Sequence, residues 1–196
     1  MEDKYKKLLI DDIGRLMAFP EEAYRLVFSE LELKSIKRGK ILKAQGDSDT
    51  VSRYLCEGFI GSYRFNETQH LLSVIYRPTD TVFDDRSFRT GIPSDTILKC
   101  ISDVVFYEFS LDSERDVLER YPRFVELAHK ISLRINERNA IVFELSKKGL
   151  EKGYEELMML FPGLEPAITN DDLGAFFRVS RRTVERFKHD LKNKKR

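Results

Sequence analysis

The chain of 196 residues lacks most features that mark membrane, secreted or disulfide-rich proteins. It contains no run of about 18 apolar residues, so no membrane-spanning segment is predicted. Residues 1–7 are highly charged and carry no apolar signal-peptide core, which favours a cytoplasmic protein. Only two cysteines occur, Cys56 and Cys100. They are too few for a disulfide framework or a four-thiolate cluster, and we expect both to be reduced.

Catalytic and metal-binding signatures are also missing. His70, His129 and His189 lie far apart, and none is at a metal-ligand spacing from a second ligand, so no metal is predicted. No P-loop, Gly-x-Ser-x-Gly or His-Glu-x-x-His sequence is present, so we expect neither enzymatic activity nor a cofactor. The adjacent Asp84 and Asp85 raise the alternative of a hydrolytic or divalent-cation site. Neighbouring side chains of an extended segment point to opposite faces, which favours a solvated turn instead.

Charge is distributed unevenly along the chain. Between residues 178 and 196 there are nine basic and two acidic residues, a net charge of +7, whereas the whole chain carries +1. The remaining residues therefore sum to −6. A strongly basic end on a nearly neutral protein is expected where a protein contacts the phosphate backbone of a nucleic acid.

The same basic region is predicted to form two short helices joined by a tight turn. Leu173 and Phe176 share one face of the first helix. Gly174 leaves room for a second helix to cross closely. Residues 178–180 form the turn, and Ser180 is a natural N-cap for the second helix.

The second of these helices is amphipathic, with Val184, Phe187 and Leu191 on its apolar side. A polar face with arginine and glutamate suits the major groove, where arginine reads guanine and glutamate accepts from cytosine. The candidate DNA-binding residues are Ser180, Arg181, Arg182, Thr183, Glu185, Arg186 and His189. Lys192 and residues 194–196 are expected to add charge without sequence preference. The alternative is an ordinary helical hairpin with a solvated face, which the turn sequence and the one-sided charge disfavour.

Upstream of this region the apolar period changes twice. A helical pattern covers residues 12–31, and residues 34–109 read as short strands punctuated by Gly and Asp. Short strands at regular spacing are typical of a compact antiparallel barrel or roll. Helical periods then return, with a short helix to residue 121, a long helix over residues 123–148 and another over residues 154–161.

The long helix carries a heptad pattern of mostly apolar residues. Its positions are Phe124, Ala128, Ile131, Ile135, Arg138, Val142 and Leu145. A seam of about three heptads favours contact with a second copy of the chain, and packing against its own domain is the alternative. We therefore expect a parallel homodimer and a division into three parts: a roll over residues 1–122, a dimerisation helix over 123–148, and a DNA-binding domain over 150–196.

The order of these parts resembles the Crp/Fnr family of bacterial transcription regulators along nearly the whole chain. In the predicted roll, the resemblance is carried by Phe83 and by glycines at the turns, Gly39, Gly46 and Gly58. In the C-terminal part it is carried by residues 154–164 and 172–186. Residues 154–164 resemble the C-terminal region of Bacteroidetes-type members of the family. It implies an α+β fold: an N-terminal antiparallel β-roll of the double-stranded β-helix or jelly-roll kind with flanking helices, a long dimerisation helix and a C-terminal helix-turn-helix (HTH) domain. Because the sequence ends at Arg196, little or no wing is expected.

The resemblance also implies a function. Members of the family bind a two-fold-related DNA operator as homodimers and regulate transcription, which makes RNA polymerase a further candidate partner. Ser180, Arg181, Thr183 and Arg186 match the family's recognition-helix pattern. Arg182 departs from it, because Glu is common at that position, so the base preference is expected to differ. Arg178 stands where the family often has a turn glycine, and it needs either a negative φ or compensation for the strain.

The ligand cassette of the family is altered in this chain. Cyclic-nucleotide binders carry Gly-Glu-Leu/Ile-Ala, followed by an Arg and a small hydroxyl residue, and these groups hold the phosphate and the ribose. The matching residues here are Phe83, Asp84, Asp85, Arg86, Ser94, Asp95 and Thr96. Several carboxylates near a phosphate at low dielectric would repel it. We therefore expect no binding of cyclic AMP, and the effector is left open.

Two functional hypotheses follow from the sequence. The first is a DNA-binding transcription regulator. The second is a ligand-sensing or protein-interaction module whose HTH-like tail contacts another protein. DNA binding predicts an affinity that falls steeply with salt, whereas a protein interface of mixed charge need not show this dependence.

Overall fold

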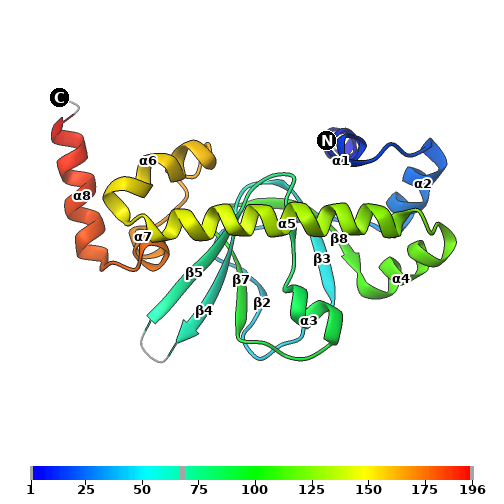
Figure 1. The fold of residues 1–196 in the computed structure, drawn as a ribbon, viewed down its shortest axis with the longest axis horizontal. Coiled ribbons are helices and arrows are strands. Elements are labelled where there is room, and N and C mark those ends of the chain that lie inside the picture. Colours follow the sequence, from blue (N-terminus) through cyan, green and yellow to red (C-terminus); the bar gives the residue numbers. More distant parts are fainter. Residues whose placement is uncertain (1, 67–68, 195–196) are drawn as a thin grey trace.

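In the computed structural model, which describes residues 2–66 and 69–194, the alternating middle of the chain forms two four-stranded antiparallel sheets (Figure 1). Their strand orders are β1-β8-β3-β6 and β2-β7-β4-β5. The strands are β1 Glu32–Ile36, β2 Ile41–Lys43, β3 Val51–Glu57, β4 Ile60–Asn66, β5 Gln69–Tyr76, β6 Thr81–Val82, β7 Thr96–Cys100 and β8 Val104–Ser110. The pairs β1·β8, β2·β7, β3·β6 and β4·β5 fold the chain back on itself as a doubled hairpin, so the predicted jelly-roll arrangement is confirmed.

The turn between β3 and β4 shows why glycine is needed in the roll. Gly58 has a φ of +86°, and a Cβ placed on it would lie 2.1 Å from the carbonyl oxygen of Asp103. An L-residue would therefore be strained in its backbone and would also collide with the loop that precedes β8. Gly39 and Gly46 also have positive φ, so all three glycines predicted at roll turns lie at sharp turns.

The part of the chain that the structure describes contains eight helices. They are α1 Glu2–Leu16, α2 Glu21–Glu30, α3 Asp85–Thr90, α4 Leu111–Arg120, α5 Phe124–Lys147, α6 Leu150–Leu160, α7 Asn170–Phe177 and α8 Arg181–Lys194. None of the described helices is both long and apolar enough to span a bilayer.

The starts of two helices were predicted wrongly, and one helix was missed. The N-terminal helix begins at Glu2 instead of residue 12, because Tyr5, Leu9 and Ile13 repeat every four residues and are buried. The helix predicted from residue 154 begins at Leu150, so Gly153 lies inside α6. Helix α3 was not predicted at all.

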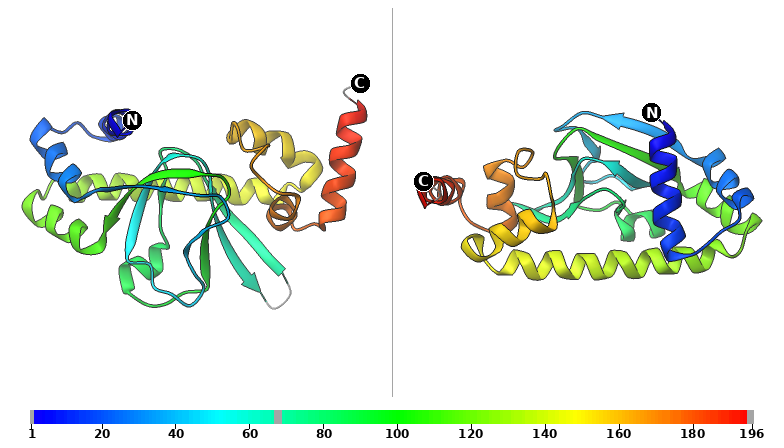
Figure 2. Two further views of the ribbon diagram at one scale, coloured as in Figure 1. Left: turned by 180° about the vertical axis from the view of Figure 1, so that it is seen from behind. Right: turned by 90° about the horizontal axis from the view of Figure 1, so that it is seen from above.

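Helix α5 runs along the β-roll and links two groups of helices (Figures 1 and 2). Helices α1, α2 and α4 gather at one end of α5, and α6, α7 and α8 lie at the other end. Between the two sheets, side chains such as Leu55, Leu98 and Phe106 fill the interior of the roll. The C-terminal helices share one apolar cluster with the second sheet, in which Tyr63 and Ile75 join Leu157 and Phe176. The predicted roll and C-terminal domain are therefore in direct contact.

Part of the heptad side of α5, which was predicted to form a dimer seam, faces its own chain. Phe124, Val142 and Leu145 are buried in intramolecular clusters. Arg138, the charged interruption of the pattern, pairs with Asp80 at 3.4 Å and lies over the Tyr76 ring. The remaining positions, Ala128, Ile131 and Ile135, are half-buried. The period arises because α5 packs along the roll, which was the alternative reading of the pattern.

Candidate nucleic-acid interface

Helix α7 is positioned by a capping box and by a close approach to the turn that follows it. Thr169 accepts a hydrogen bond from the backbone N–H of Asp172, and the Asp172 carboxylate accepts from the backbone N–H of Thr169. This reciprocal pair satisfies donors that the helix leaves free. A Cβ on Gly174 would lie 2.7 Å from the carbonyl oxygen of Val179. Glycine is thus what lets the turn lie directly against α7.

The turn contains an unusual backbone conformation. Arg178 is left-handed, with φ 59° and ψ 42°, and its N–H donates to the carbonyl oxygen of Gly174. The position that the family often fills with glycine therefore has positive φ here, which costs a non-glycine residue about 1–2 kcal/mol. Val179 also donates its N–H to the Gly174 oxygen at 3.0 Å. These two hydrogen bonds hold the turn and offset part of the strain.

Helix α8 begins at a polar cap and is anchored by one buried side chain. Ser180 Oγ accepts from the Thr183 N–H at 3.2 Å, as expected for an N-cap. Val184 is fully buried, and Phe187 and Leu191 are half-buried on the same side. The Phe187 ring meets Tyr154 of α6 edge to face, with 5.2 Å between ring centroids. The apolar side predicted for this helix therefore packs against α6 and α7.

The opposite side of α8 is an exposed polar ridge. Arg182, Arg186 and His189 are exposed and lie on the face away from Val184. Within the described part of the chain, neither Arg182 nor Arg186 has a hydrogen-bond or ion-pair partner. Both guanidinium groups are free to bind an external acceptor. We call Arg182, Arg186 and His189 the α8 ridge.

The other predicted interface residues lie beside this ridge. Glu185 Oε1 accepts a hydrogen bond from Arg181 Nε at 2.7 Å. Arg181 also pairs with Asp171 of α7 at 3.2 Å. Arg181 lies one turn before Glu185 on α8 and faces α7, so it is the arginine in reach of both carboxylates. Ser180 and Thr183 share a hydroxyl contact of 2.9 Å at the N-terminus of α8.

Contacts between the roll and the C-terminal helices were missed in the sequence. Tyr63 of β4 donates its hydroxyl to Asp172 Oδ1 at 2.8 Å. Arg77, just after β5, donates to the carbonyl oxygen of Leu160 at the end of α6 and lies 5.9 Å from the Phe161 ring centroid. Neither residue has a local sequence pattern that indicates its partner. These contacts fix the orientation of α7 and α8 relative to the roll.

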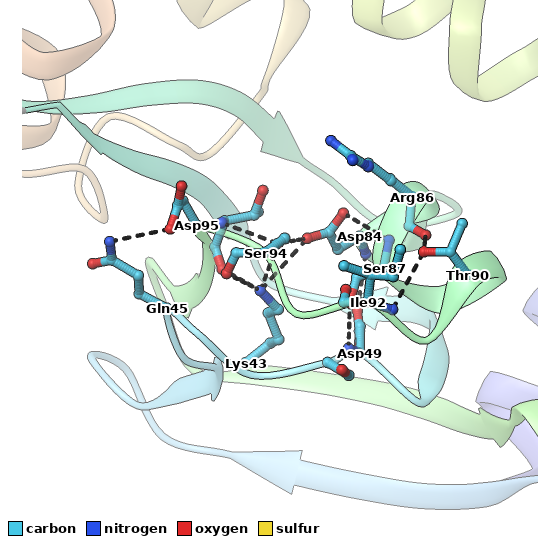
Figure 3. Close-up of polar contacts among 12 residues, drawn as sticks. Lys43, Gln45, Asp49, Asp84, Arg86, Ser87, Thr90, Ile92, Ser94 and Asp95 are labelled. Carbon is cyan, nitrogen blue, oxygen red and sulfur yellow. Dashed lines mark hydrogen bonds and ion pairs between the residues drawn. The ribbon is translucent and has the colours of Figure 1, made fainter.

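The cassette residues form an internally neutralised cluster, shown in Figure 3. Asp84 is the N-cap of α3, and its carboxylate accepts from the Ser87 N–H and from the Ser94 hydroxyl. Lys43 Nζ lies 3.5 Å from Asp84 Oδ2 and donates to the carbonyl oxygens of Ser94 and Thr96 at 3.0 and 2.7 Å. A carboxylate of the chain itself thus occupies the position where α3 would meet an anion, and a buried lysine neutralises it.

The prediction of a solvated turn at Asp84 and Asp85 was wrong for Asp84. Its side chain is only 9% exposed. Burial opposes ionisation of Asp84, but hydrogen bonds from Ser94 and Ser87 and the charge of Lys43 outweigh it and lower the pKa of the carboxyl. Asp85 is exposed and pairs with Arg89 at 2.8 Å. Two buried partners, Lys43 and Asp49, were missed, because a lysine in a strand is expected to be exposed and Asp49 precedes the strand that buries it.

The other cassette residues are spread around this cluster. Phe83 packs edge to face on Phe88, with 5.2 Å between ring centroids. Arg86 is exposed and points away from Asp84 (Figure 3). Asp95 is exposed and accepts from Gln45 Nε2 at 3.4 Å, and Thr96 is buried. The structure therefore brings together Asp84 and Ser94 but neither Arg86 nor Asp95.

Comparison with known proteins finds similarity in fold only. No protein-family model and no curated protein sequence matches the chain. Among solved structures, the c-di-GMP responsive global regulator CLP of Xanthomonas campestris has a TM-score of 0.67 at 11% identity, covering 89% of this chain and 93% of that chain. A CooA mutant from Carboxydothermus hydrogenoformans has 0.60 at 13% identity, covering 85% and 78%. The catabolite activator protein of Thermus thermophilus has 0.52 at 20% identity, covering 91% and 86%. The chain therefore has the cyclic-nucleotide-binding fold of the Crp/Fnr-type regulators.

Proposed function

We propose that this chain is a sequence-specific, DNA-binding transcription regulator of the Crp/Fnr type that acts as a homodimer and does not depend on cyclic AMP. The observation that carries the proposal is the α8 ridge. Its two arginines have no partner in the described part of the chain, and they lie on a helix that is capped at Ser180 and anchored by Val184. The fold shared with Crp/Fnr-type regulators supports it.

Residues of the ridge would contact bases, and residues at the start of α8 would contact phosphates. Arg182 and Arg186 would place guanidinium groups at base edges, where two hydrogen bonds to guanine distinguish it from other bases. Ser180 and Thr183, together with free backbone N–H groups at the start of α8, would contact phosphate. The Glu185 carboxylate, which accepts a hydrogen bond from Arg181, would orient the Arg181 guanidinium toward the DNA backbone. The exposed Lys192 would add attraction without sequence preference.

Replacement of Arg186 by alanine should relax sequence preference at one base pair of each half-site, at a cost of about 1–3 kcal/mol for the preferred sequence. The reason is that Arg186 is an unpaired cation on the ridge. Lys192→Ala is the matched control, because it should weaken all sequences alike and reduce the salt slope by about one unit. The experiment selects sites from random DNA with the wild type and then titrates both variants against salt. Residues 195 and 196, also predicted to contact phosphate, lie outside the described residues.

Two outcomes would contradict the DNA-binding proposal. One is that Arg186→Ala keeps the full sequence preference of the wild type. The other is that the wild type binds no DNA at about 0.05–0.1 M salt, where phosphate contacts are still strong. The protein-interaction reading of the C-terminal helices would then take its place.

A second copy of the chain would bind the outward side of α5. That side exposes four large apolar residues: Val125 at 58%, Leu133 at 49%, Ile141 at 55% and Phe143 at 49%. Several exposed apolar side chains on the outward half of one helix are expected where a partner packs. We call these residues the outer α5 face. Binding to a two-fold-related operator requires the pairing to place the two α8 ridges about 34 Å apart, one turn of DNA.

The double substitution Leu133→Glu with Phe143→Glu should convert a micromolar dimer into a monomer, because burying two carboxylates in an apolar contact is unfavourable. Sedimentation velocity measures the change. Ile10→Glu is the control, because Ile10 is an exposed apolar residue on α1, away from the outer α5 face, and the variant should stay dimeric. A wild type that sediments as a monomer with and without DNA would rule out the dimer.

A further inference from the structure

An apolar cavity lies on the side of the first sheet that faces away from the roll interior. Side chains alternate along β3 and β8, so Leu55 and Phe106 fill the roll, whereas Tyr54 and Tyr107 line the cavity. The cavity volume is about 170 Å³. Phe83, Phe88 and Arg89 also line it, so the cavity adjoins α3, but Asp84 and Lys43 are not among its lining residues.

Helices that precede and follow the strands of the roll wall this cavity. Apolar side chains come from α1, α2, α4 and α5, among them Leu9, Ile13, Val27, Val117, Leu127 and Ile131. Most of these residues belong to one apolar cluster with Tyr54 and Tyr107. A concave space of this kind, partly open to solvent and lined mainly by branched aliphatic and aromatic side chains, binds small apolar molecules.

The few polar groups at the cavity define what it accepts. The Tyr107 hydroxyl is buried and has no hydrogen-bond partner among the described residues. Arg89 and Glu114 also line the cavity. Arg89 is already bound to Asp85 at 2.8 Å. Burial raises the pKa of the Glu114 carboxyl, and Arg89 opposes that rise. An anionic ligand would lose its hydration for a cation, Arg89, that Asp85 already neutralises, whereas a neutral ligand has no charge to desolvate.

We propose that this cavity is a binding site for a small neutral organic molecule, with a single aromatic or alicyclic ring and at most one hydrogen-bonding group. A cavity of about 150 Å³ with similar lining is large enough for benzene. A single polar group on the ring would satisfy the Tyr107 hydroxyl. Because Ala128, Ile131 and Ser132 of α5 form one wall, a bound ring would contact the helix that leads into α6.

The test uses the purified full chain without DNA, so its outcome is independent of the proposed function. Toluene, p-cresol and p-toluate are compared by ligand-observed and methyl NMR, since the three share one shape and differ in polarity and charge. Toluene and p-cresol should bind saturably, with nuclear Overhauser effects to the methyl groups of Ile13 and Leu118. The p-toluate anion should bind at least about tenfold more weakly. Contacts to Leu55 or Leu98 instead, stronger binding of p-toluate, or no saturable binding of either neutral probe would overturn the proposal.

A cavity-filling variant provides a second measurement. Ala128→Leu adds three carbons at the cavity wall and should weaken toluene binding at least about tenfold. Ala140→Leu makes the same change at an exposed position of α5 that does not line the cavity, and it should bind toluene like the wild type. Equal affinity of Ala128→Leu and the wild type would overturn the assignment. If Ala128→Leu does not fold, the methyl contacts of the wild type decide alone.

Discussion

Replacement of Asp84 by asparagine should lower the free energy of unfolding by about 3–5 kcal/mol. The substitution keeps the shape of the side chain and its N-cap oxygen, but it removes the negative charge beside Lys43. The Lys43 side chain is 2% exposed, so its ammonium would be left as an uncompensated buried charge. Urea unfolding of the wild type and the variant measures the difference.

A double-mutant cycle separates the charge pair from the rest of the cluster. Lys43→Met combined with Asp84→Asn should cost clearly less than the sum of the single substitutions, because removing both charges leaves neither one unpaired. Asp95→Asn is the matched control, since Asp95 is an exposed cassette carboxylate, and its effect should stay within about 0.5 kcal/mol. The role of the pair would be refuted by an Asp84→Asn variant as stable as Asp95→Asn.

The same carboxyl makes stability depend on pH in the acid range. The pKa of the Asp84 carboxyl is lower in the folded chain than in the unfolded chain, where it is near 4. Its full contribution to the free energy of unfolding is therefore present at pH values above about 4. It is lost as the pH falls through the lower folded value. The Asp84→Asn variant should therefore lose less stability than the wild type on acidification below about pH 4.

The Asp84 and Lys43 pair also explains the expected indifference to cyclic AMP. The anion of Asp84 already satisfies Lys43, the Ser94 hydroxyl and the Ser87 N–H, so an incoming phosphate would have to displace a bound carboxylate. Titration calorimetry of the wild type with cyclic AMP should show no saturable heat. Micromolar affinity would contradict both the arrangement of this cluster and the proposed independence from cyclic AMP.

The strands of the roll could be predicted from sequence because their signals are local. Alternating side chains and glycines such as Gly58 fix each strand and turn within a few residues. Helix α3 could not be predicted in this way. It has six residues, and its cap, Asp84, is held by Lys43 and Asp49, which lie more than 30 positions earlier in the chain. Short helices of this kind are stabilised by tertiary contacts, which no local pattern records.

The heptad of α5 shows a second limit of sequence patterns. A repeat of apolar residues shows that one side of a helix is buried, but it does not identify what covers that side. In α5, Val142 and Leu145 follow the repeat and pack inside the chain, whereas Leu133 and Phe143 fall outside it and are exposed. The ion-pair partner of Glu185 also depends on a tertiary contact that no local pattern records. Arg181, Arg182 and Arg186 are all close in sequence, and only the position of Asp171 on α7 favours Arg181.

Replacement of Gly174 by valine should lower the free energy of unfolding by about 3 kcal/mol and should abolish sequence-specific DNA binding. A Cβ at this position would lie 2.7 Å from the carbonyl oxygen of Val179 and 3.6 Å from the backbone nitrogen of Arg181. The Val179 oxygen is a backbone atom of the turn, so the collision with it cannot be relieved by rotating a side chain. The turn must move away from α7, and the start of α8 must move with it.

The control for this substitution is Gly14→Val in α1. Gly14 also lies in a helix, but a Cβ placed on it would have the Tyr24 hydroxyl oxygen as its nearest neighbour, at 3.8 Å. That distance is an ordinary van der Waals contact. Glycine and valine differ little in helix propensity, so Gly14→Val should leave stability within about 0.5 kcal/mol and DNA binding unchanged. DNA affinity is compared at a temperature where circular dichroism shows each variant fully folded. If folded Gly174→Val binds its operator like the wild type, the close crossing of α7 and α8 does not position the α8 ridge, because the displaced helix would then read the same bases.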